Sequence, residues 1–124
     1  TVTGAILGAM GEEAAGLFSN QDKLAIQLLA AGEATGERAW KMPLYTEYLE
    51  GLKSQIADLK NACLNRRAGA CTAALFLQQF IQDDLPWAHF DIAGTAYVSK
   101  SSAFQPSRAT GYGVKLMVEF LRSL

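Results

Sequence analysis

The stretch W-A-H-F-D-I-A-G at residues 87–94 decides the fold class of this sequence. Its apolar residues fall at both odd and even positions, so both faces of a strand formed there would be apolar. Strands of this kind lie in the middle of a sheet that helices cover on each side. The sequence therefore predicts an α/β fold with residues 87–94 as a central strand.

Two stretches near the start are predicted as further buried strands. Residues 1–10 read T-V-T-G-A-I-L-G-A-M, and residues 14–19 read A-A-G-L-F-S after the turn at Gly11. Both stretches are short and apolar, and their length suits strands better than helices.

The clearest helix follows residues 14–19. Ser19 or Asn20 can cap its first turn, and Asp22 lies where the helix dipole favours an anion. Gly36 ends the helix. Its buried face is predicted to contain Leu24, Leu28 and Ala31.

Extended and helical segments alternate after Gly36. Residues 40–42 must be extended because Pro43 disfavours a helical predecessor. A short amphipathic helix follows, with one stripe formed by Tyr45, Tyr48, Leu49 and Leu52. Residues 54–59 fit either a short strand or irregular chain, and residues 61–69 are predicted as a loop.

An apolar helix is predicted from Ala70 to about Gln82, where Asp83, Asp84 and Pro86 stop it. Its apolar residues cover so much of the circumference that we expect burial on two sides. These residues are Leu75, Phe76, Leu77, Phe80 and Ile81.

The last part of the sequence begins with a long segment that has no periodic pattern, residues 95–113. Compact domains rarely hold so long a connection unless it lines a site or contacts a partner. The final helix is predicted to dock on the sheet through Val114, Met117, Val118 and Leu121.

Composition limits the classes of function. The 124 residues are 50% apolar and suit one domain, and 11 Lys plus Arg against 12 Asp plus Glu leave a net charge of −1. Nucleic acid and anionic membranes are therefore poor candidate partners. Charged residues make up 19%, below the roughly 25% usual for soluble domains, which indicates a larger assembly.

The first residue is Thr1 and no cationic leader follows it, so we expect a segment of something longer. Its apolar start is too short to span a membrane.

Cysteine and histidine are too few for the common metal sites. Cys63 and Cys71 form no CxxC pair, and we expect both to be packing residues in a reducing compartment. A zinc site built on imidazoles normally needs two or three histidines, and His89 is the single one.

Two predicted strand ends are the places where a ligand could bind, residues 1–4 and residues 91–96. In open α/β sheets, ligands bind beyond the carboxyl ends of strands. Gly4 and Gly94 would let a ligand approach the backbone closely, or would only release turns. Spacing alone leaves these two interpretations equal.

Other polar and aromatic residues point to chemistry less clearly. Asp91 and His89 lie on one face of a strand, yet no nucleophile stands at a known spacing, so a structural role is favoured. Arg66 and Arg67 could bind a carboxylate or could simply be solvated. Three aromatic residues of the long segment fit a pocket, a subunit contact or core cover: Tyr97, Phe104 and Tyr112. The sequence contains no phosphate-binding loop, nucleophile elbow or metal-ligand spacing, so the spacing of its residues alone identifies no reaction.

Three strings together resemble the C-terminal part of the leucyl (cytosol) aminopeptidase family. They are T-V-T-G-A at 1–5, R-A-G-A-C-T-A-A at 67–74 and W-A-H-F-D-I-A-G-T-A at 87–96. The likeness runs nearly end to end and includes residues 28–44 and 109–121. It implies the C-terminal portion of a three-layer α/β/α catalytic domain with a mixed sheet.

The resemblance implies a cytoplasmic, hexameric peptidase that removes N-terminal residues, preferably leucine, from peptides with two divalent ions, manganese or zinc. In the family the metal ligands and catalytic residues lie upstream of the first string. Residues 1–124 alone are therefore expected to hold no metal and to be inactive, with the remainder of the catalytic domain as their partner. A noncatalytic α/β binding or assembly module is the alternative.

Matching positions imply substrate contacts. Thr1, Val2 and Gly4 would meet the substrate through the backbone, and Ala93 and Ala96 would line the pocket for its first side chain. The sequence departs from the family pattern at three places. Ala96 stands where bulkier residues also occur, which puts the pocket size and the preference for leucine in doubt. The other two departures are loop changes whose effect is left open: Arg108 stands where small residues are common, and residues 61–67 differ from the usual pattern.

Overall fold

The computed structural model describes residues 1–63, 67–100 and 108–124. Its main sheet contains β1 (Ala15–Ser19), β2 (Ala39–Lys41) and β3 (Ala88–Asp91) in the order β2-β1-β3. β1 pairs parallel with β2 and antiparallel with β3, so the sheet is mixed, as predicted.

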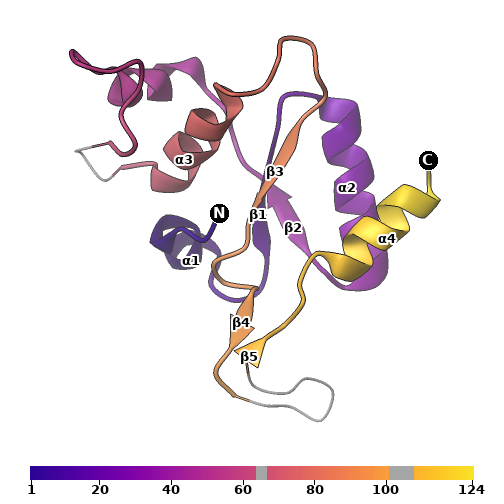
Figure 1. Cartoon of the computed structure of the whole chain (residues 1–124). Helices are drawn as coiled ribbons and strands as arrows, with labels where there is room; N and C mark the ends of the chain where they lie inside the picture. Colours follow the sequence, from indigo (N-terminus) through magenta and orange to yellow (C-terminus); the bar gives the residue numbers. More distant parts are fainter. Residues whose placement is uncertain (64–66, 101–107) are drawn as a thin grey trace.

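Helices cover both faces of this sheet (Figure 1). Side chains alternate along a strand, so Leu17 and Phe18 of β1 face opposite sides. Leu17 packs with α2 (Asp22–Thr35) and α4 (Val114–Arg122), whereas Phe18 packs with α1 (Gly4–Met10) and α3 (Gly69–Gln78). The three-layer α/β/α prediction is confirmed.

Within the sheet that the described residues form, the position predicted for residues 87–94 is wrong. β1, which is fully buried along its length, is the central strand, and β3 lies at the edge of the described sheet. The apolar residues of the stretch 87–94 still face two layers. Phe90 of β3 packs on the α2 and α4 side, and Trp87, which directly precedes β3, packs on the α1 and α3 side. Residues apolar on both faces therefore indicate covered faces, but they do not place a strand in the middle.

The strand predicted at residues 1–10 is also wrong, because this segment forms α1. The Thr3 hydroxyl accepts a hydrogen bond from the Ile6 N–H at 3.1 Å and caps the helix. Gly11 ends it with a φ of 61°, a conformation that glycine adopts easily. Ile6 is the buried residue of this helix. The strand predicted at 14–19 is confirmed as β1.

The predicted helix after β1 is confirmed as α2, with Gly36 as its left-handed C-cap and Asp22 in its first turn. The predicted cap is wrong, because Gln21 occupies the N-cap position without a side-chain bond. The Ser19 hydroxyl instead donates to the Trp87 carbonyl at 2.8 Å, and Asn20 binds Leu85 and Trp87. These polar side chains fasten β1 to the segment before β3.

The middle of the chain is less regular than predicted. The predicted amphipathic helix is a 3₁₀ helix, η1 (Thr46–Leu52), and residues 54–59 form no strand. α3 ends at Gln78, about four residues early, and Phe80 is 68% exposed. Burial of this helix on two sides is therefore wrong for the described chain.

The final helix forms, but its predicted docking face is reversed. Leu116 is fully buried and Phe120 packs beside it against the α2 layer. The predicted stripe instead faces outward, with exposed fractions of 41–64% at Met117, Val118, Leu121 and Val114. Both faces of α4 are apolar, and the described chain covers one of them.

The long segment 95–113 contains a small second sheet of β4 (Tyr97–Val98) and β5 (Arg108–Ala109), paired antiparallel (Figure 1). Within the described ranges, no helix has the length and apolar character needed to cross a membrane.

Candidate functional site

The structure brings the two predicted ligand-binding segments together. We call residues 1–4 the N-terminal segment and residues 93–96 the turn segment. The Thr1 nitrogen donates to the Phe90 carbonyl at 2.9 Å, and the Ile92 N–H donates to the Thr1 carbonyl at 2.8 Å. Thr1 therefore lies alongside the end of β3, directly before the turn segment.

Asp91 joins the two segments from inside the protein. Its side chain is 0% exposed. Its Oδ1 accepts from the Thr3 N–H at 2.9 Å and the Ala93 N–H at 3.4 Å, and its Oδ2 accepts from the Thr3 hydroxyl. A buried carboxylate needs such partners, and these partners come from both segments. The structural role favoured for Asp91 is consistent with these bonds.

The turn segment is held by its own backbone and by packing against α1. The Thr95 and Ala96 N–H groups both donate to the Ile92 carbonyl, at 3.1 and 2.9 Å. A Cβ at Gly94 would lie 1.9 Å from the Gly11 carbonyl oxygen. The close approach at Gly94 is therefore made by the chain itself, which favours the structural interpretation of this glycine.

The five predicted substrate residues differ in exposure. Thr1, Val2 and Gly4 are exposed, and Ala93 and Ala96 are half-buried. A Cβ at Gly4 would meet nothing within 4 Å, so the space beside its backbone is open. The backbone N–H and carbonyl of Val2 make no hydrogen bond within the described residues. A ligand could bond to these groups without displacing an internal partner.

His89 lies beside the N-terminal segment and is neutral. Its ring stacks between Phe18 and Trp87, with centroids 6.0 Å from each, and its Nε2 is 2.9 Å from the Thr1 hydroxyl oxygen. Burial is the main cause that lowers the pKa of His89 to about 4, and the negative charge of Asp91 opposes the shift. His89 therefore serves as a polar contact for Thr1 rather than as a cation.

This shift predicts a pH dependence of stability. An unfolded histidine has a pKa near 6.5, so between about pH 6.5 and 4 the unfolded chain binds a proton that the folded chain does not. We expect the free energy of unfolding to fall as pH falls through this window. Near pH 5, the number of protons taken up on unfolding should be greater in the wild type than in His89→Gln by up to about one. Urea unfolding across pH 4–7 measures how the free energy of unfolding changes with pH. Equal slopes of this free energy against pH for the wild type and His89→Gln would refute the prediction.

Within residues 1–63, 67–100 and 108–124, the remaining candidates add no cluster of metal-ligating side chains. Cys71 is buried, Cys63 is half-buried, and both are free thiols, in keeping with packing roles. Burial raises the pKa of Cys71, which keeps it a thiol. Arg67 is exposed, and Arg66 lies outside the described residues.

The aromatic residues of the long segment separate. Tyr97 is 58% exposed, and Phe104 lies outside the described residues. The Tyr112 hydroxyl donates to the Arg38 carbonyl at 2.8 Å, and burial, followed by the Glu37 charge, raises the pKa of Tyr112 to about 12. Arg108 has a φ of 115°, a region that side chains rarely adopt, which fits a position where small residues are common.

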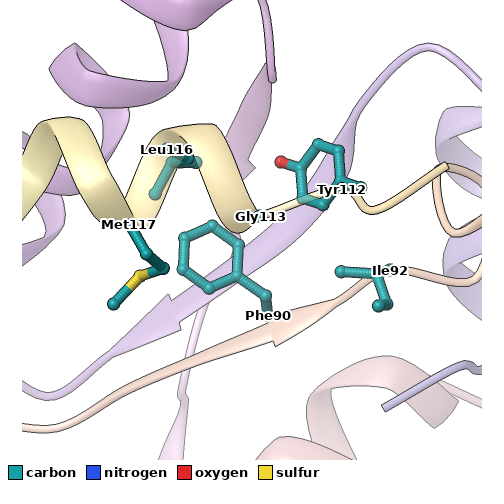
Figure 2. A pocket seen from close by; sticks show the side chains of 6 residues that line it. All are labelled: Phe90, Ile92, Tyr112, Gly113, Leu116 and Met117. Atoms are coloured by element: carbon teal, nitrogen blue, oxygen red, sulfur yellow. The ribbon is translucent and has the colours of Figure 1, made fainter.

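A cavity of about 190 Å³ lies between β3 and α4 (Figure 2). Its lining is apolar apart from the Tyr112 hydroxyl: Phe90, Ile92, Tyr112, Gly113, Leu116 and Met117. Figure 2 shows the Phe90 ring beside Met117 and Leu116. Because Tyr112 already donates to a backbone carbonyl, this cavity offers no acid, base or nucleophile.

In the described ranges, no three His, Cys, Asp or Glu side chains gather as metal ligands. Both Asp91 oxygens accept hydrogen bonds, and His89 Nε2 contacts Thr1. These residues do not fit a two-metal centre.

Thr3 is the site residue that sequence reasoning missed. It caps α1 and bonds twice to Asp91, 88 positions away. A threonine before a glycine and an apolar run is an N-cap signal, which the strand prediction for residues 1–10 overlooked.

Residues 1–118 match the model of the cytosol aminopeptidase family, catalytic domain. A probable cytosol aminopeptidase of Protochlamydia amoebophila is 55% identical over 100% of this chain and 25% of its own length. One of Roseiflexus castenholzii is 57% identical over 98% of this chain and 25% of its own length. The chain thus spans about a quarter of these curated relatives.

Solved structures agree. The bottromycin maturation enzyme BotP in complex with Mn superposes with a TM-score of 0.92 at 39% identity, over 98% of this chain and 27% of its own. A tomato leucine aminopeptidase mutant gives 0.87 at 41% identity, over 98% and 23%. With its layers, its mixed sheet and nearly all of its residues matched, the chain belongs to the cytosol aminopeptidase family.

Proposed function

We propose that residues 1–124 are the C-terminal segment of the catalytic domain of an aminopeptidase that removes N-terminal residues, preferably leucine, from peptides. The observation that carries this proposal is the junction of the N-terminal and turn segments across Asp91. Family membership and the relatives named aminopeptidases support the reaction.

In this proposal the chain binds the substrate. The unpartnered backbone groups of Val2 and the open space beside Gly4 suit hydrogen bonds to the peptide's amino end. Thr1 lies beside them, with its own nitrogen and carbonyl already bonded to Phe90 and Ile92, and so holds this backbone in place. Ala93 and Ala96 line the pocket for the first side chain, and their small size leaves room for an apolar group such as leucine.

The metal ions belong elsewhere in this proposal. Two divalent ions, manganese or zinc, would activate the attacking water in the complete enzyme. The described residues do not fit such a centre, so its ligands are assigned to the remainder of the catalytic domain, and residues 1–124 alone should be inactive. The Mn complex of BotP supports manganese.

The surroundings of the chain are proposed on the same basis. The name cytosol aminopeptidase carried by the relatives supports a cytoplasmic location. The exposed apolar stripe of α4 supports contact with the rest of the protein or with other subunits of a hexamer.

The test is an assay of the full-length protein that contains this chain. With leucine p-nitroanilide and added manganese, we expect turnover that a chelator abolishes and manganese restores. In sedimentation, we expect the full-length protein to have a mass of about six subunits. The 124-residue chain at equal concentration should show none. A full-length protein without turnover would favour the noncatalytic binding or assembly module. Activity in the 124-residue chain would show that the assignment of the metal ligands to the remainder of the catalytic domain is wrong.

A further inference from the structure

Asp91 is buried at a point where three backbone segments meet. It ends β3, the N-terminal segment passes it on one side, and the turn segment follows it directly. The carboxylate is 0% exposed, so it is sheltered from solvent and reaches substrate only through its neighbours.

The same carboxylate oxygen binds both segments. Oδ1 accepts from the N–H of Thr3 at 2.9 Å and from the N–H of Ala93 at 3.4 Å. Hydrogen bonds to a charged, buried acceptor are stronger than neutral ones. Movement of either segment away from Asp91 would therefore break a bond and leave a charge poorly paired.

Thr3 carries this restraint into the N-terminal segment. Its hydroxyl donates to Asp91 Oδ2 and also accepts from the Ile6 N–H, so the start of α1 is fixed with it. Thr1, two residues earlier, is bonded to Phe90 and Ile92 on either side of Asp91. Val2, with its free backbone groups, is thus held between two anchored residues.

We propose that Asp91 is a positioning residue of the peptide site. Through Thr3 and Ala93 it fixes the distance between the backbone at Val2 and Gly4 and the small side chains of the turn segment. That distance decides how well the first residue of a peptide fits. The inference rests on the proposed function and adds a residue that does not touch substrate.

The test compares variants in the full-length protein with leucine p-nitroanilide. Thr3→Val removes the hydroxyl at nearly constant shape, Thr3→Ser restores it, and Asp91→Asn removes the charge. We expect KM to rise roughly tenfold in Thr3→Val and Asp91→Asn with kcat within about threefold, because binding rather than chemistry is impaired. Thr3→Ser should stay within about twofold of wild type.

Glu37→Gln is the matched control, because Glu37 is also a buried carboxylate that accepts backbone N–H groups, at the start of α4. It should lower stability without changing KM. If Asp91→Asn and Thr3→Val change KM no more than Glu37→Gln does, Asp91 has only a structural role and the proposal is overturned.

Hydrogen exchange in the 124-residue chain separates this proposal from the proposed function. We expect the Thr3 and Ala93 amides to exchange about tenfold faster in Asp91→Asn than in Glu37→Gln. Equal exchange overturns the positioning role even if the enzyme is active. If full-length wild type lacks turnover but the exchange difference is seen, the proposed function fails and the coupling of the two segments by Asp91 stands.

Discussion

Gly94→Ala is expected to lower the free energy of unfolding by about 3 kcal/mol or more. The new Cβ would lie 1.9 Å from the Gly11 carbonyl oxygen, 2.9 Å from the Gly11 carbonyl carbon and 3.3 Å from the Glu12 Cα. All three are backbone atoms, so no side-chain rotation can relieve the overlap. Either the turn segment or the end of α1 must move.

Gly8→Ala is the control for this substitution. A Cβ at Gly8 meets nothing within 4 Å, and Gly8 lies inside α1, where alanine is favoured over glycine by about 0.5–1 kcal/mol. Urea unfolding of the two variants should therefore move the midpoint in opposite directions. A Gly94→Ala protein within about 0.5 kcal/mol of wild type would show that the turn segment does not pack on α1 as described.

The local sequence was sufficient to predict a helix or strand where its apolar residues follow one clear pattern. α2 shows a single apolar face ended by a glycine, and β1 is a short apolar run between turns, so both were predicted. α1 was not, because seven residues with two glycines are too short to show a helical period. The deciding feature is the Thr3 cap, whose hydroxyl also depends on Asp91.

The docking face of α4 shows a different limit. Its sequence has an obvious apolar stripe at Val114, Met117, Val118 and Leu121, yet this chain buries Leu116. Periodicity shows that a face is apolar but not which partner covers it. In a chain that spans about a quarter of its relatives, other polypeptide can cover such a face.

The candidate site was located from the sequence only in outline. The rule that ligands bind at strand ends selected residues 1–4 and 91–96, and the structure joins them. The bonds that join them link residues 88 positions apart, and no local pattern reports such a contact. The rule also misjudged the N-terminal segment, which precedes a helix rather than ending a strand.

Glu37 is a buried residue that no local pattern singled out, and it caps α4 from another part of the chain. Its side chain is 7% exposed, and its Oε2 accepts from the N–H of Gly113 at 3.1 Å and of Leu116 at 2.8 Å. These N–H groups lie in the first turn of the helix, where the dipole also favours a negative charge. Glu37 therefore fixes the start of α4 against the end of α2.

Glu37→Ala is expected to cost about 2–4 kcal/mol of stability, because two backbone N–H groups lose their acceptor and a buried space opens. Glu37→Gln keeps an oxygen and should cost only about 1 kcal/mol. Glu33→Ala is the matched control: this exposed acid of α2 should change stability by less than about 0.5 kcal/mol. Urea unfolding gives the order of stability of the three variants. Hydrogen exchange at the Leu116 amide shows whether the loss of stability lies at the start of α4. If Glu37→Ala costs no more than Glu33→Ala, α4 is anchored by Leu116 and Phe120 packing alone.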